Sequence, residues 1–167
     1  MMMIQLLIAA TLAQGVEAEI FAEAEGWSIA RQGSACLMTR EFGDEGNSLF
    51  ALSVDPIDTT LPLTLLVGNG GWSPPEADDS GYHIEFSGNN AAWRDLAVHT
   101  FTTEGTDGTP DGVISIGFAA DAVVPMLEDV GGASGIHLSR QGVTVVRLSF
   151  GGSDAAVRSL GECLTAP

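Results

Sequence analysis

The stretch GVTVVRLSFGGSDAAVRSLGEC, residues 142–163, decides which fold we expect for the whole chain. Its first half predicts a β-strand, because Val146, Leu148 and Phe150 recur at period two and fall on one face. Arg147 falls on the opposite, wetter face. Two glycines then end the strand, since glycine adopts backbone angles that other residues avoid. One face of this strand is therefore expected to pack on a core.

The second half of the stretch predicts a short helix that carries one of the two cysteines of the chain. We expect Ser153 to be its N-cap, because a serine hydroxyl can bond a free backbone N–H of the first turn. Asp154 follows, where the helix dipole favours a negative charge. An apolar face at helical spacing directs Cys163 towards the sheet. A disulfide to Cys36 is then one prediction, and two separate buried thiols are the alternative.

The rest of the chain reads as short strands separated by turns rich in glycine. A short helix is expected at 121–130, and residues 92–101 fit a strand and a helix equally. The sequence therefore predicts a mainly β domain, an antiparallel β-sandwich or curled barrel with two short helices near the C-terminus. The other expected strands are 27–30, 35–39, 49–54, 61–67, 82–87, 113–118 and 135–140.

The N-terminal segment MMMIQLLIAATLAQGVEA, residues 1–18, resembles a signal peptide. It has an apolar run followed by a small-x-small ending, with the expected cut after Ala18, although no Lys or Arg precedes the run. The run is too short to span a membrane. Residues 19–167 would then form one exported domain, periplasmic or secreted. A buried N-terminal strand or helix is the alternative.

The charge balance restricts the possible partners. The chain has 22 acidic and 6 basic residues, a formal net charge of −16. A nucleic acid is therefore an unsuitable partner, because binding it needs a basic surface, and anionic membranes are disfavoured for the same reason. A cationic protein or a bound cation is electrostatically suited. The alternative is that the charge only keeps the protein soluble.

Two motifs mark the two ends of the chain, GWSIARQGSAC at residues 26–36 and LSFGGSDAAVRSLGEC at residues 148–163. In these motifs the chain resembles small exported proteobacterial proteins, including the invasion-associated locus B family. The resemblance implies a periplasmic β-rich domain and transfers no catalytic residue. The positions that carry it are Trp27, Cys36, Leu148, Gly152, Ser153, Ala155, Leu160 and Cys163.

A glycine-rich loop, TEGTDGTPDG at residues 103–112, gathers three carboxylates, those of Glu104, Asp107 and Asp111. Several hard oxygen ligands on a bendable loop suit Ca²⁺, so this loop is the candidate metal site. Its spacing does not match the EF-hand pattern. The alternative is a solvated hairpin loop, and no other cofactor is indicated.

Catalytic signals are weak in this sequence. His83, His99 and His137 include no pair four residues apart, and the chain contains no lysine, which excludes a P-loop. A Gly-x-Ser-x-Gly elbow is absent, although a Ser-His-Asp triad can assemble from distant residues. Trp72, in the loop GNGGWSPP, is the candidate partner-binding residue, and packing against the sheet edge is its alternative role.

We therefore expect an exported, non-catalytic binding or interaction module that engages a cationic protein. A Ca²⁺-assisted hydrolase and a purely structural envelope protein are the alternatives. A cleft that gathers one of the histidines with a carboxylate and a serine would favour the hydrolase.

Overall fold

The computed structural model describes residues 17–43, 48–70, 81–104 and 110–167. These residues form two antiparallel sheets and two helices near the C-terminus, without a closed barrel, so the predicted mainly β class is confirmed. The large sheet has the order β1 (Glu19–Ala24), β2 (Trp27–Gln32), β3 (Ala35–Phe42), β4 (Ser48–Val54), β5 (Leu63–Gly70), β9 (Pro110–Phe118) and β8 (His99–Glu104). The small sheet has the order β11 (Val143–Ser149), β10 (Gly135–Arg140), β6 (Tyr82–Ser87) and β7 (Ala92–Leu96).

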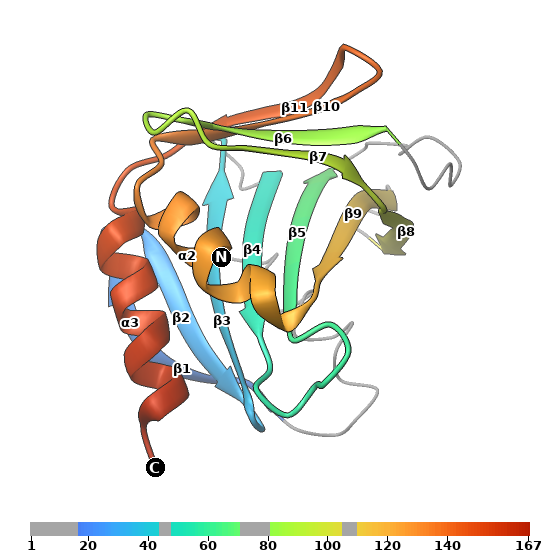
Figure 1. Ribbon diagram of the computed structural model, residues 1–167. Helices are drawn as coiled ribbons and strands as arrows, with labels where there is room; N and C mark the ends of the chain where they lie inside the picture. Colours follow the sequence, from blue (N-terminus) through green and yellow to red (C-terminus); the bar gives the residue numbers. More distant parts are fainter. Residues whose placement is uncertain (1–16, 44–47, 71–80, 105–109) are drawn as a thin grey trace.

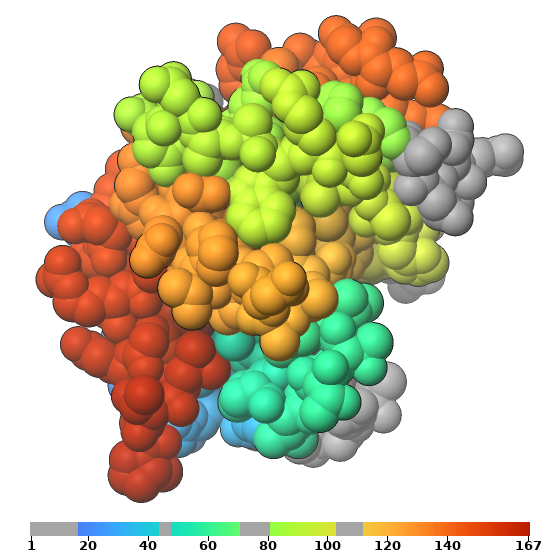
Figure 2. Space-filling model, viewed as in Figure 1, coloured from blue at the N-terminus to red at the C-terminus, as the bar shows by residue number. Residues whose placement is uncertain are grey.

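The small sheet lies across one end of the large sheet, and the two helices pack against one face and one side of the large sheet (Figure 1). The 3₁₀ turn η2 (Ala120–Ala122) leads into α2 (Val123–Gly131), which crosses the face of the large sheet below the small sheet. The last helix, α3 (Ser153–Thr165), lies along β1 and β2. In Figure 2 the side chains of α2, in orange, close the space between the small sheet at the top and α3 at the left.

The core occupies the space between these layers. β4 is buried on both faces, with Phe50, Ala51 and Leu52 all 0% exposed, as its unbroken apolar sequence predicts for a central strand. Trp27 and Phe150 pack on Phe50, with ring centroids 5.7 and 5.6 Å from it. Phe150 directly follows β11 (Val143–Ser149), and Leu148 of this strand also belongs to the core, so the last strand does direct one face into the core.

Residues 92–101 form two strands that belong to different sheets. β7 pairs with β6 in the small sheet, and β8 pairs with β9 in the large sheet. The strand alternative is therefore correct and the helix is not. Asp95, one residue before the end of β7, has a left-handed φ of 55°, and this change of direction breaks the period-two pattern that one continuous strand would show.

The last helix is attached to the large sheet by the predicted disulfide. Cys36 in β3 and Cys163 in α3 are bonded, with an S–S distance of 1.97 Å and a Cα–Cα distance of 6.1 Å. The alternative of two separate thiols is therefore wrong. Arg31 adds a second attachment, because its Nη2 donates to the carbonyls of Cys163 and Ala166, the latter at 2.7 Å.

The predicted N-cap of α3 is wrong. The residue before the helix is Gly152, with φ 70°, and no side chain caps the first turn. Ser153 is instead the first helical residue, and its buried hydroxyl donates to the carbonyl of Ala133 at 2.9 Å. That carbonyl follows α2, so the hydroxyl joins the two helices. Asp154 lies in the first turn as expected.

The loop before β5 contains the one carboxyl group whose pKa shift is resolved among the described residues. Backbone N–H groups of Leu61 and Thr60 donate to Asp58 Oδ1 at 3.0 and 2.8 Å. These two bonds favour the ionised carboxylate and so hold the pKa of Asp58 below its ordinary value. The bond from Leu61 has the larger effect.

Within the described residues, neither helix has the length and apolar character that crossing a bilayer requires.

Candidate functional site

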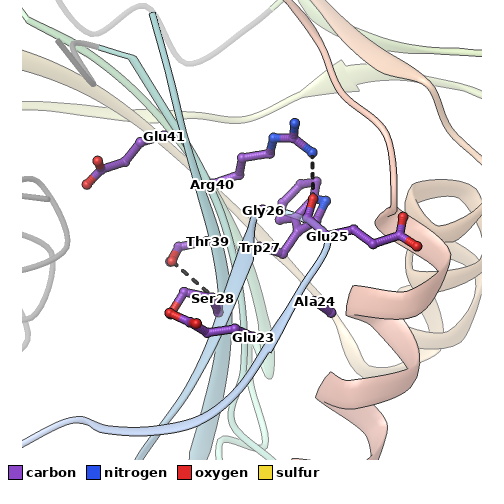
Figure 3. A pocket seen from close by; sticks show the side chains of 9 residues that line it. All are labelled: Glu23, Ala24, Glu25, Gly26, Trp27, Ser28, Thr39, Arg40 and Glu41. Carbon is purple, nitrogen blue, oxygen red and sulfur yellow. Dashed lines mark hydrogen bonds between the residues drawn. The ribbon is translucent and has the colours of Figure 1, made fainter. Parts of the chain in front are cut away.

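Two surface hollows gather polar side chains, and the first lies at the turn between β1 and β2. We call it the hairpin hollow; it has a volume of about 470 Å³ and is lined by β1, β2 and β3 (Figure 3). The turn residues Glu25 and Gly26 both have left-handed φ angles, 49° and 85°. Such a two-residue turn follows the natural twist of a hairpin, and Gly26 takes this conformation without a steric cost.

Arg40 lies at the centre of the hairpin hollow. Its guanidinium carbon lies 5.6 Å from the ring centroid of Trp27 and 5.6 Å from that of Phe42. Arg40 Nη1 donates to the carbonyl of Gly151 at 2.7 Å, and the indole Nε1 of Trp27 donates to the same oxygen at 2.9 Å. Arg40 therefore joins the hairpin to the segment before α3, and its charge is already engaged.

Three carboxylates surround this arginine, those of Glu23, Glu25 and Glu41. Figure 3 shows that they do not converge: Glu25 is directed towards α3, and Glu41 points to the opposite side. Among the described residues, no three His, Cys, Asp or Glu side chains are placed to hold a metal ion. The rim of the hairpin hollow is therefore a spread acidic surface and not a metal cage.

The second hollow, which we call the small-sheet hollow, lies on the outer face of the small sheet and has a volume of about 490 Å³. The register of the strands builds it. Glu85 of β6 and Arg147 of β11 are both direct neighbours of His137 of β10, so the three side chains form a row across adjacent strands. Arg94 of β7 and Asn90 also line the hollow.

His137 connects a carboxylate and a hydroxyl on this face. Its Nδ1 lies 3.3 Å from Glu85 Oε2, and its Nε2 lies 2.9 Å from Thr144 Oγ1. The side chain of His137 is 19% exposed and that of Glu85 is 53% exposed. Glu85, His137 and Thr144 therefore supply the three groups of a hydrolytic triad, although the hydroxyl belongs to a threonine and not to a serine.

The other two histidines do not join this row. His83 Nδ1 accepts a hydrogen bond from the backbone N–H of Asp95 at 3.3 Å, and His99 packs on Phe101 with ring centroids 5.9 Å apart. The sequence predicts that Arg147 lies on the wetter face of its strand, which is correct because this side chain is exposed.

The residues predicted from the loops are only partly covered by the described part of the chain. Trp72 and Asp107 lie outside the described residues. Glu104 and Asp111 lie on paired strands at the β8–β9 hairpin, where Glu104 is opposite Pro110 and Thr103 is opposite Asp111. The hairpin itself is thus present, and the calcium site stays a prediction. Residues 1–16 of the expected signal peptide also lie outside the described residues.

Comparisons of the chain with protein-family models, with curated proteins and with solved structures found no match.

Proposed function

We propose that this protein is a non-catalytic binding module of the periplasm or cell surface, and that it engages a cationic protein. The observation that carries the proposal is the surface of β1, the edge strand of the large sheet. Ile20 and Phe21 on this strand are 51% and 39% exposed, and the carboxylates of Glu23 and Glu25 follow them at the hairpin. Exposed apolar anchors beside charge of one sign suit a protein interface better than a small cation.

Bulk properties support the same proposal. A net charge of −16 attracts a basic partner over long range and speeds its encounter. The disulfide suits an oxidising compartment, which agrees with the signal-like segment at residues 1–18 and with the class implied by the resemblance of the chain ends. Export is part of the proposal.

Binding to two basic proteins of known structure tests this proposal. Lysozyme is a cationic hydrolase, and cytochrome c is a cationic protein that is not a hydrolase. A preference for lysozyme would therefore distinguish recognition of a hydrolase from simple charge attraction. We expect binding at low ionic strength that weakens as salt is added, because exposed charges are screened. Absence of binding to both proteins at low ionic strength would contradict the proposal.

A matched pair of variants locates the surface. Glu23→Gln with Glu25→Gln removes two negative charges at the hairpin, and Asp121→Asn with Glu128→Gln removes two exposed ones near α2. The first pair is expected to weaken binding and the second to leave it nearly unchanged. Equal weakening by both pairs would show that net charge alone governs the attraction.

A second candidate function is favoured by the contacts of His137 with Glu85 and Thr144. A hydrolase would use the Thr144 hydroxyl as nucleophile, His137 as general base and Glu85 to orient the imidazole. Turnover of p-nitrophenyl acetate that is lost in both His137→Gln and Thr144→Val would support it. A hydrolysis rate equal to that in buffer alone would exclude hydrolysis of p-nitrophenyl acetate by Glu85, His137 and Thr144.

A further inference from the structure

The six arginines of this chain differ in their contacts, and the two for which the described residues provide no partner lie in one hollow. Of the six, Arg31 and Arg40 donate to backbone carbonyls, Arg158 lies 3.8 Å from Asp154, and Arg140 stacks on the ring of Tyr82. Within the part of the chain that the structure describes, Arg94 and Arg147 form no hydrogen bond and no ion pair, and both line the small-sheet hollow. The chain has 22 carboxylates, so two unpaired guanidinium groups in one place are unexpected.

The topology of the small sheet directs these two charges at a common space. β11 and β7 are the two edges of the sheet, and β10 and β6 lie between them. Three strand spacings separate the edges by about 14 Å. The long side chains of Arg147 and Arg94 therefore approach the hollow from opposite edges, with His137 and Glu85 on its floor.

The donors in the hollow select the chemistry of a ligand. A guanidinium group presents a planar fork of N–H donors that matches two oxygens of a carboxylate or a phosphate. Asn90 and Ser87 also line the hollow, and residues of these types can bond hydroxyl groups. A volume of about 490 Å³ lies within the range of small-molecule sites.

We propose that the small-sheet hollow binds the oxyanion group, carboxylate or phosphate, of a small hydroxylated molecule such as a sugar acid or a sugar phosphate. The net charge of −16 restricts the ligand to a small one, because a polyanion would be repelled by the rest of the surface. The negative charge of Glu85 repels an anionic ligand. The contact of Glu85 with His137 Nδ1 keeps its carboxylate beside the imidazole and away from the two arginines. This inference is independent of the proposed protein partner, which engages β1 and the hairpin.

Calorimetric titration with three hexoses tests the proposal. Glucuronate carries a carboxylate, glucose 6-phosphate carries a phosphate, and glucose carries neither. Binding of either anionic sugar at millimolar concentration, without binding of glucose, supports the site, and the preferred sugar identifies the oxyanion. Failure of both anionic sugars to bind, or equal binding of glucose, would overturn it.

Three variants locate the binding. Arg94→Gln with Arg147→Gln should weaken binding at least tenfold, whereas Arg158→Gln on α3 should leave it unchanged. Glu85→Gln removes the opposing charge and should tighten binding several-fold. These side chains are exposed or half-exposed, so the variants should keep the thermal midpoint of the parent. Binding that survives the double substitution, falls equally in Arg158→Gln or does not change in Glu85→Gln would overturn the assignment.

Discussion

Removal of the Cys36–Cys163 disulfide should destabilise this protein more than any single surface change. The bond joins residues that are 127 positions apart, so it closes a loop that contains most of the described chain. In the chain-entropy account, a crosslink stabilises the native state because it restricts the unfolded chain, by −2.1 − 1.5R ln n in entropy. For a loop of this length the contribution is about 5 kcal/mol at 25 °C.

The contacts that remain after the bond is removed should keep α3 in place. Ala156 and Leu160 are 0% exposed against the core, and Arg31 still donates to the carbonyl of Ala166. A domain of this size has a total stability of about 5–15 kcal/mol, so the double variant Cys36→Ala with Cys163→Ala loses a third or more of it. At about 2–4 °C per kcal/mol, the thermal midpoint should fall by about 10–20 °C.

Guanidinium unfolding followed by circular dichroism measures this loss. The denaturant slope should increase in the double variant, because the uncrosslinked chain exposes more surface when it unfolds. The parent protein in reductant, with its thiols shown to be free by alkylation, is the matched control and should reproduce the midpoint of the variant. A fall in the midpoint of less than about 2 °C, with an unchanged slope, would refute the reasoning from loop closure.

Three further changes probe single contacts. Tyr82→Phe should leave stability unchanged or raise it by up to about 2 kcal/mol in urea unfolding, because the buried Tyr82 hydroxyl has no hydrogen-bond partner among the described residues; a loss would contradict this. Arg31→Ala should lower the unfolding free energy by about 1–3 kcal/mol, since it removes charged donors from carbonyls at the end of α3. Asp58 has a pKa held low by the N–H groups of Leu61 and Thr60, so its ionised form stabilises the fold above roughly pH 4, and this contribution is lost as the pH falls through the folded pKa. The stability difference between the parent and Asp58→Asn, measured by urea unfolding, should therefore shrink on acidification.

The sequence predicts most of the strands because their signals are local. The alternation in β6 and β11 and the apolar run in β4 each identify a strand and the face that it buries. The turn between β10 and β11 is local as well, since Gln141 and Gly142 both take the left-handed φ angles that a tight hairpin turn requires. These features depend on neighbours along the chain and not on distant partners.

The functional surfaces depend on distant partners, which is why the sequence does not predict them. The row of Glu85 and His137 requires the register of β6 against β10, and these residues are 52 positions apart. No single strand carries a signal for that register. The N-cap prediction for Ser153 fails for a related reason, because the helix begins at Ser153 itself and its hydroxyl is directed to the carbonyl of Ala133, 20 residues earlier.

The segment at residues 142–163 contributes to both hollows. Arg147, on the wall of the small-sheet hollow, lies three residues before Phe150, whose ring packs on Trp27 with centroids 5.3 Å apart. The next carbonyl, that of Gly151, accepts hydrogen bonds from Trp27 and from Arg40 in the hairpin hollow. Because Phe150 and Gly151 directly follow β11, the aromatic contact with Trp27 and the shared carbonyl attach the end of this strand to the hairpin. The carboxylates of Glu23 and Glu25 and the guanidinium groups of the small-sheet hollow therefore lie on separate elements, and among the described residues they form no ion pair with one another.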